Sequence, residues 1–168
     1  VGQDGGAPQI GNSDDPAWTN SSLRLWSASG ALIDHRHSNR YLFEATPDLR
    51  DQMNLLNSLS DGGNAPLGLS GIFLTHAHIG HYAGLIFVGH ESAGTQGLKV
   101  FSLPRMQNYL ENNGPWEQLV NYKNIDLIPI TAKKATVFDN DLSVTAHLVP
   151  HRDEYSETAG YVINGPSR

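Results

Sequence analysis

Three histidines, His76, His78 and His81, stand close together in the sequence. They directly follow the apolar run 71–74, which predicts a short buried strand. Imidazole is the commonest protein ligand for zinc, and it also suits iron and other first-row metals. Alternate side chains of an extended chain point the same way, so His76 and His78 are expected on one side. The spacing therefore predicts one wall of a metal site.

A further ligand is expected from His151, which follows Pro150 at the end of the predicted strand 142–149. Proline ends the pairing of a strand, so His151 is expected at a strand tip, where catalytic groups are frequent. Three histidines and a water molecule form the open coordination of a catalytic metal. We interpret four residues as candidate catalytic and metal-binding groups for one or two zinc ions, with iron or manganese as alternatives: His76, His78, His81 and His151.

Carboxylates could complete such a site. Asp4 lies in a glycine-rich segment that could approach a site closely, although a turn in which Asp4 bonds its own backbone is the alternative. Three acidic residues near His151 could also donate a carboxylate, or could form a solvated loop: Asp153, Glu154 and Glu157. The remaining histidines are interpreted as turn, helix-end or packed residues: His35, His37, His90 and His147.

Composition limits the class of protein. The 168 residues suit one domain spanning 1–168, and they include no cysteine, so any metal must be held by His, Asp or Glu. A formal charge of −6 and the lack of a basic run argue against a nucleic-acid partner. No apolar stretch approaches the ~20 residues that span a bilayer. A small-molecule substrate is the expected partner.

The two ends of the chain also carry expectations. The chain begins at Val1 and not at methionine, which suggests a removed leader and favours a periplasmic or secreted protein over a cytoplasmic one. It stops at Arg168, soon after an apolar strand-like run, as a cleaved or truncated chain would. We therefore expect the sequence to be the N-terminal portion of a domain.

Periodicity and turn signals predict strands that alternate with helices, which is typical of an α/β layered domain. Thr46 is expected as the N-cap of a helix with Pro47 at its first position, ending near residues 61–64. Other helices are expected at 81–89, from Pro104 to residue 113, and around 116–120. Strands are expected at 23–27, 40–45, 71–74, 98–103, 125–130, 136–138, 142–149 and 160–163, with a polar turn at 35–39.

Residues 75–81 (Thr-His-Ala-His-Ile-Gly-His) resemble the His-x-His-x-Asp-His signature of the metallo-β-lactamase fold superfamily. Three further stretches are similar to the branch of the coenzyme pyrroloquinoline quinone (PQQ) synthesis protein B: residues 3–9, residues 104–106 with 113–116, and residues 149–161. The resemblance implies an αββα sandwich with metals at one edge of its sheets. It assigns His76, His78 and His151 to a first metal and His81 to a second.

The sequence departs from the family pattern at two places. Gly80 stands where the family has an aspartate that binds the second metal and orients the water, so a full two-metal site is in question. The acidic residue that bridges the metals in the family, and a later histidine, would lie beyond Arg168. A second fragment or a partner subunit is therefore expected to complete the fold.

The leading functional hypothesis is a metal-dependent hydrolase that uses a metal-bound water or hydroxide on an ester, lactone, amide or phosphoester. One alternative is an iron-dependent oxidoreductase related to PQQ biosynthesis, because histidine and carboxylate ligands suit Fe(II) as well as zinc. Another is a metal- or ligand-binding protein without turnover, which the glycine at position 80 favours. β-Lactamase activity is not implied by the fold name.

Overall fold

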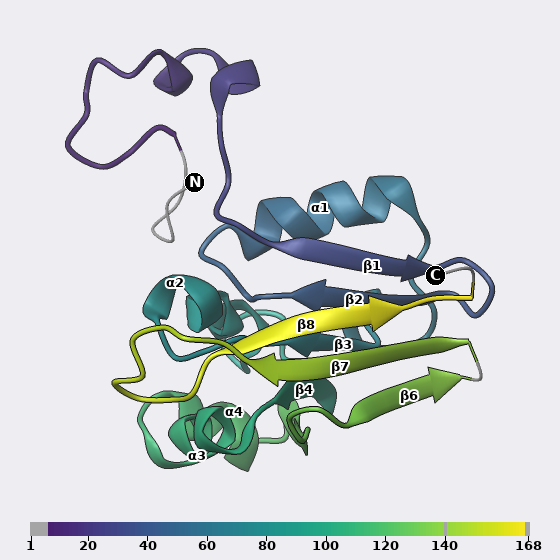
Figure 1. The fold of residues 1–168 in the computed structure, drawn as a ribbon. Helices are drawn as coiled ribbons and strands as arrows, with labels where there is room; N and C mark the ends of the chain where they lie inside the picture. The colour runs from purple at the N-terminus through teal and green to yellow at the C-terminus, as the bar shows by residue number, and fades with distance from the viewer. Residues whose placement is uncertain (1–6, 140, 167–168) are drawn as a thin grey trace.

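The computed structural model describes residues 7–139 and 141–166, which form two β-sheets and a set of helices (Figure 1). The strands are β1 (Gly30–Asp34), β2 (Asn39–Phe43), β3 (Gly71–Phe73), β4 (Leu98–Ser102), β5 (Ile125–Pro129), β6 (Ala135–Asp139), β7 (Leu142–Leu148) and β8 (Ala159–Asn164). The α-helices are α1 (Leu49–Leu59), α2 (Ile79–Tyr82), α3 (Pro104–Asn112) and α4 (Trp116–Asn121), and α2 continues into the 3-10 helix η4 (Ala83–Val88). Within the described ranges, none of the helices has the length and hydropathy needed to cross a membrane.

The first sheet has the strand order β1-β2-β3-β4-β5. β1 and β2 form an antiparallel hairpin, whereas β2, β3, β4 and β5 run parallel to one another. Parallel neighbours require crossover connections, which the helices supply here. All three residues of β3 are buried, as expected of a strand covered on both faces. The carboxyl ends of β2 and β3 consequently lie at the same edge of the sheet.

The second sheet consists of β6, β7 and β8 in antiparallel order. Burial alternates along β7, where Leu142, Val144 and Ala146 are buried and the residues between them are half-buried. This period of two directs one apolar face towards the first sheet. The second sheet ends near the same edge as β3, because Ala159 at the start of β8 donates its N–H to the Thr75 carbonyl over 3.0 Å.

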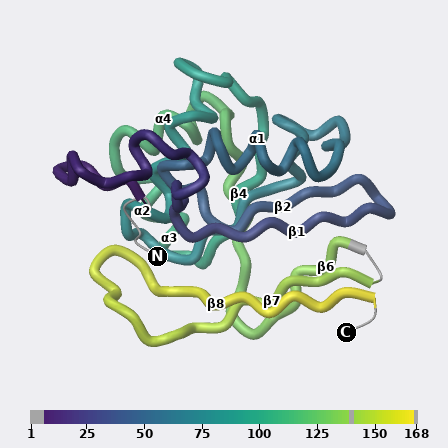
Figure 2. Tube along the Cα trace, turned by 90° about the horizontal axis from the view of Figure 1, so that it is seen from above, coloured from purple at the N-terminus to yellow at the C-terminus, as the bar shows by residue number. Residues whose placement is uncertain are grey.

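The layers follow the order helices, five-stranded sheet, three-stranded sheet (Figure 2). One apolar core joins the helices to the first sheet, and a second core lies between the sheets. Phe73 is at the centre of the second core, stacked on Phe43 and Phe101 at centroid distances of 4.9 and 4.6 Å. Tyr161 meets the same ring edge-on at 5.3 Å. The layered α/β class is confirmed, and the described residues supply the αββ part of the predicted sandwich.

The prediction of a strand at 23–27 is wrong. Asn20 caps a 3-10 helix at Ser21–Leu23 instead, and Leu25 is 60% exposed. The strand that pairs with β2 is β1, which directly precedes the predicted turn at 35–39. A hairpin requires its first strand next to the turn, so the apolar run at 23–27 lies too far upstream to pair.

Two helix predictions need correction. The first helix begins at Leu49 and not beside Thr46, because residues 46–49 form a turn in which the Thr46 carbonyl accepts the Leu49 N–H at 3.0 Å. The Thr46 hydroxyl still accepts the Asp48 N–H, so it starts a turn instead of capping the helix. The helix expected at 81–89 is α2 followed by η4, since the backbone of Tyr82 is not helical (φ −135°). Gly84 packs directly on the Thr46 carbonyl, where any side chain would clash.

We predict that Phe73→Ala lowers the free energy of unfolding by about 3–5 kcal/mol, because it removes the ring that joins the two sheets. The matched control is Val137→Ala on β6, a side chain that is 65% exposed, for which the change should stay within about 0.5 kcal/mol. Urea unfolding followed by circular dichroism measures both. Equal losses for the two variants would contradict the central position of Phe73.

Candidate metal centre

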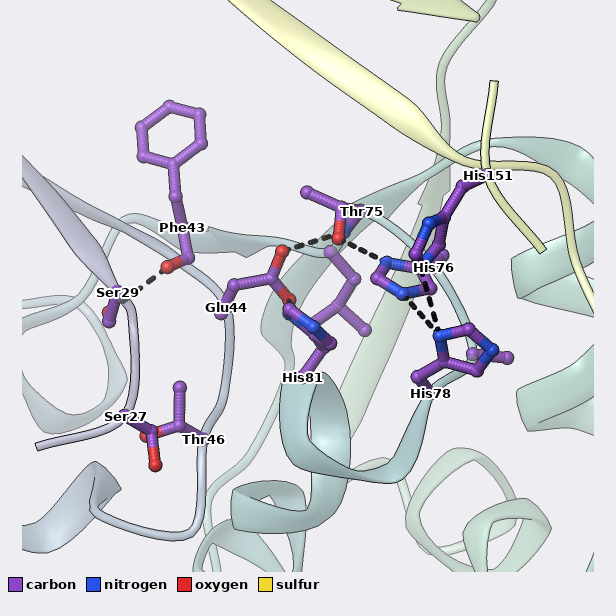
Figure 3. Close-up of polar contacts among 12 residues, drawn as sticks. Ser27, Ser29, Phe43, Glu44, Thr46, Thr75, His76, His78, His81 and His151 are labelled. Atoms are coloured by element: carbon purple, nitrogen blue, oxygen red, sulfur yellow. Dashed lines mark hydrogen bonds and ion pairs between the residues drawn. The ribbon is translucent and has the colours of Figure 1, made fainter. Parts of the chain in front are cut away.

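His76 and His78 lie on the chain segment that leaves the buried strand β3 (Figure 3). The segment is extended as far as His78 (φ −94°, ψ 133°), so both imidazoles project to the same side. Nε2 of His76 lies 2.8 Å from Nδ1 of His78. The alternation expected from the sequence therefore brings the two rings together.

His151 reaches the same point from the second sheet, on the connection between β7 and β8. Its Nε2 lies 3.2 Å from Nδ1 of His78. One nitrogen each from His76, His78 and His151 falls within 4.8 Å of the others. We call these three residues the three-histidine cluster. His76 is 4% exposed, His78 half-buried and His151 exposed, so the cluster opens to solvent on the His151 side.

The nitrogens on the far sides of two of these rings have polar partners. Nδ1 of His76 lies 2.7 Å from the Thr75 hydroxyl, and Nε2 of His78 lies 3.0 Å from a carboxylate oxygen of Glu154. When each far nitrogen carries the proton and donates it, the nitrogen that faces the cluster presents a lone pair. Such partners fix the tautomer and orientation of metal-binding histidines.

The strand β8 and the connection that precedes it hold the histidine segment in place through three hydrogen bonds. The Tyr161 hydroxyl donates to the Leu74 carbonyl at 2.6 Å, and the Ala159 N–H donates to the Thr75 carbonyl at 3.0 Å. The buried Ser156 hydroxyl accepts the Ala77 N–H at 2.8 Å. Burial, together with the Glu44 and Glu157 carboxylates, raises the pKa of Tyr161, so its phenol stays protonated and remains a donor.

The surroundings of His76 favour its uncharged form. Burial, followed by the neighbouring histidines and Arg152, lowers the pKa of His76 to about 3. His76 is therefore neutral near pH 7 and has a lone pair available. The hydrogen bond to His78 lowers the pKa of Glu154, which keeps that exposed carboxylate ionised as an acceptor. Neutral imidazole is the form that binds metals.

His81 lies beside the cluster but outside the set of three nitrogens. Its ring centroid is 4.3 Å from that of His76, and its Nδ1 is 3.5 Å from a carboxylate oxygen of Glu44. Sequence reasoning missed Glu44, which follows β2 and is 5% exposed. Parallel pairing of β2 with β3 places Glu44 and the histidine segment at one edge of the sheet. Glu44 could have been predicted as a neighbour of the histidines had that pairing been assumed.

The other predicted candidates are placed as follows. Asp4 lies outside the described residues. Glu154 contacts His78, whereas Glu157 accepts the Arg105 backbone N–H at 3.1 Å. The Asp153 carbonyl accepts from the Arg105 side chain at 3.1 Å. Within 7–139 and 141–166, the four histidines that were interpreted as structural join no group of three possible ligands: His35, His37, His90 and His147.

The donor set of the three-histidine cluster fits a first-row metal ion. Three imidazole nitrogens suit zinc, iron or copper, and an open side leaves room for a further ligand. Metal binding also needs oriented rings and a free lone pair. Thr75 and Glu154 orient the rings of His76 and His78, and the neutral state of His76 leaves its lone pair available.

Comparison with protein families places most of the chain in a known family. A family model described as "Beta-lactamase superfamily domain" matches residues 39–168, which include β2 to β8 and all four candidate histidines. A comparison with curated proteins gives no match.

Solved structures with similar folds include Zn(2+)-bound PqqB from Methylobacterium extorquens, with a TM-score of 0.69 and 19% identity. They also include a diphosphatase from the PhnP family, with a TM-score of 0.61 and 20% identity. The matches cover 96% and 94% of this chain but only 58% and 57% of those proteins. At these identities the likeness shows the fold. PqqB is also the branch that the sequence motifs resemble.

We predict that Ser156→Ala destabilises the protein by about 1–3 kcal/mol, because it leaves the buried Ala77 N–H without an acceptor. The control is Ser92→Ala, an exposed serine in a turn on the helical side, which should change stability by less than about 0.5 kcal/mol. Urea unfolding at neutral pH measures both. If Ser156→Ala matches its control, the Ser156 hydroxyl does not hold the histidine segment.

Proposed function

The chain belongs to the β-lactamase superfamily, and from that premise we propose that it is a metal-dependent hydrolase of a small molecule. The bond cleaved is an ester, lactone, amide or phosphoester. We further propose that His76, His78 and His151 are the ligands of the metal that the reaction requires.

The observation that carries this proposal is the convergence of three imidazole nitrogens from two sheets. His76 and His78 follow β3, and His151 comes from the β7–β8 connection, yet one nitrogen from each lies within 4.8 Å of the others. Imidazoles from two separate segments of the chain do not gather in this way to fill a core, because their polar nitrogens need partners. A cation that accepts all three lone pairs explains the arrangement.

A bound divalent cation supplies Lewis acidity, polarising the scissile group and lowering the pKa of water. The protein residues have separate tasks. Thr75 and Glu154 hold the rings of His76 and His78 in orientation through their far nitrogens. The packed segment around Ala77 and Ser156 keeps the cluster rigid, and the exposed side at His151 admits the substrate.

Zinc is the metal that we propose first. A cluster of imidazoles without thiolate suits zinc, and the similar PqqB structure is described as Zn(2+)-bound. Hydrolysis is supported by the family and by the fold shared with a diphosphatase. Iron-dependent oxidation is the second candidate, because the motifs resemble the PQQ-synthesis branch and imidazole also binds Fe(II). Metal analysis of the purified protein separates the two candidates.

We predict that His78→Ala abolishes metal-dependent hydrolysis and weakens zinc binding by more than about 100-fold, since loss of a partner behind a ligand already costs 10–100-fold. The control is His147→Ala on β7, which lies outside the cluster and should leave both quantities unchanged. Zinc affinity is measured by competition with a chromophoric chelator. Turnover is measured on a panel of esters, lactones and phosphodiesters.

Two results would count against the proposed function. Turnover that persists in the presence of a strong chelator would show that no metal is needed. Tight zinc binding without turnover on any substrate of the panel would instead favour a binding protein.

A further inference from the structure

We propose that a cavity between the two sheets, at the amino ends of β2, β3 and β4, binds a small organic anion that carries an aromatic ring. The volume of the cavity is about 460 Å³, within the range of about 300–1,000 Å³ that small-molecule sites occupy. The histidines follow the carboxyl end of β3, so the cavity and the three-histidine cluster lie at opposite ends of the parallel strands (Figure 1). The proposed site does not require a metal at the histidines.

The first sheet changes character along the face that it turns towards the second sheet. Tyr41 on β2 and Phe101 on β4 belong to the core between the sheets. Side chains two residues apart on a strand share a face, so Asn39 and Lys99 lie on that face too, nearer to the amino ends of their strands. Lys99 is exposed and Asn39 is half-buried. The core therefore opens at this end into a space with an aromatic floor and a polar rim.

Three aromatic rings line the cavity: Tyr41, Phe101 and Phe138. The centroid of the Phe138 ring, which β6 carries, lies 4.7 Å from that of Tyr41 and 5.6 Å from that of Phe101. Gly71 on β3 leaves room for this floor, because a side chain there would clash with the Phe101 ring. Phe138 is half-buried, so part of its ring stays uncovered. Aromatic rings pack on one another in offset or edge-to-face contacts, so this surface suits a planar ring.

The polar groups at the rim offer hydrogen-bond donors. The Ser70 hydroxyl donates to Oδ1 of Asn39 at 2.8 Å, which orients the amide and leaves its Nδ2 group as a donor. Lys99 lines the same cavity with an ammonium group. Of the described residues that line the cavity, none is acidic. An anionic group at the rim would therefore meet a positive charge and an amide N–H, and hydrogen bonds between charged groups are the strong ones.

Asp126 is the acidic residue that could compete for Lys99. The two residues are neighbours in the register of β4 and β5. The Asp126 carboxylate lies beside Gly97, since a Cβ atom at Gly97 would be 3.1 Å from Oδ2 of Asp126. Within residues 7–139 and 141–166, no ion pair joins Lys99 to Asp126 or to another acid. The ammonium group, on its flexible stem, can therefore turn to a ligand.

The two parts of the cavity together define the class of ligand. The aromatic floor favours a planar apolar ring, and the rim favours a carboxylate or another anionic group attached to that ring. Inorganic anions would leave the floor uncovered, and neutral aromatic compounds would leave the ammonium group of Lys99 without a partner. An aromatic carboxylate satisfies both parts.

The test compares cinnamate with cinnamyl alcohol, which has the same ring and no charge. Binding of each compound to the metal-free full chain is measured by isothermal titration calorimetry, because a bound metal could itself coordinate the carboxylate. The wild type should bind one cinnamate per chain, at least about 10-fold more tightly than the alcohol. Lys99→Met keeps the stem and removes the charge, so it should weaken cinnamate binding about 10-fold and leave the alcohol unaffected.

The matched control is Lys134→Met, which removes an exposed lysine that does not line the cavity. It should change both affinities by less than about twofold, because salt screens distant surface charges. Ala65→Phe, at a half-buried lining position, fills part of the cavity and should abolish binding of both compounds. If circular dichroism shows that Ala65→Phe is unfolded, Lys99→Met decides the matter, because Lys99 is exposed. His78→Ala should bind cinnamate as the wild type does.

Four results would overturn the proposed site. These are no saturable binding of cinnamate to the wild type, equal affinity for cinnamate and the alcohol, unchanged cinnamate affinity in Lys99→Met, and loss of cinnamate binding in His78→Ala. The last would place the anion at the histidines and not at the opposite end of the strands. None of the four bears on zinc binding or hydrolysis, so the proposed function stands or falls separately.

Discussion

The whole candidate site depends on how the chain is held where it leaves β3. Between Leu74 and Ala77 the backbone is bonded on both sides. On one side the Phe101 carbonyl of the first sheet accepts at 3.0 Å, and on the other the bonds come from Tyr161 and Ala159 of β8 and from Ser156 on the connection before it. Hydrogen bonds at Leu74, Thr75 and Ala77 fix the backbone of this segment. They thereby fix the directions in which the side chains of His76 and His78 leave the chain.

That constraint also explains why polar groups can be buried here. The imidazoles of His76 and His78 each have an orienting partner, Thr75 on the same segment and Glu154 on the β7–β8 connection. Glu44, at the end of β2, lies beside His81 with a carboxylate oxygen 3.5 Å from its Nδ1. Burial in such surroundings favours the neutral ring, which is why the pKa of His76 falls to about 3.

Local sequence patterns predicted most of the elements but only part of the site. The apolar run before His76 and the proline at position 104 determine β3 and the start of α3, because burial and a fixed φ act locally. The approach of His151 was predictable from its place after a strand. Glu44 was not, because its position depends on parallel pairing of β2 with β3 and on a positive φ, and neither has a local signature. The strand expected at 23–27 is absent for a related reason. The hairpin turn, and not the apolar residues alone, determines which segment pairs with β2. The roles of the histidines as ligands stay predictions.

The distribution of the three-histidine cluster over two sheets has a consequence for folding. His76 and His78 are carried by one sheet and His151 by the connection of the other, so their nitrogens meet only after the sheets have docked through Phe73 and its neighbours. Any ligand that engages all three binds the docked state and not the separated one. By mass action, its binding free energy then adds to the cohesion between the layers. The stability of the fold is therefore linked to the fraction of protein with ligand bound at the three histidines. The thermal midpoint of unfolding should rise with the free concentration of that ligand.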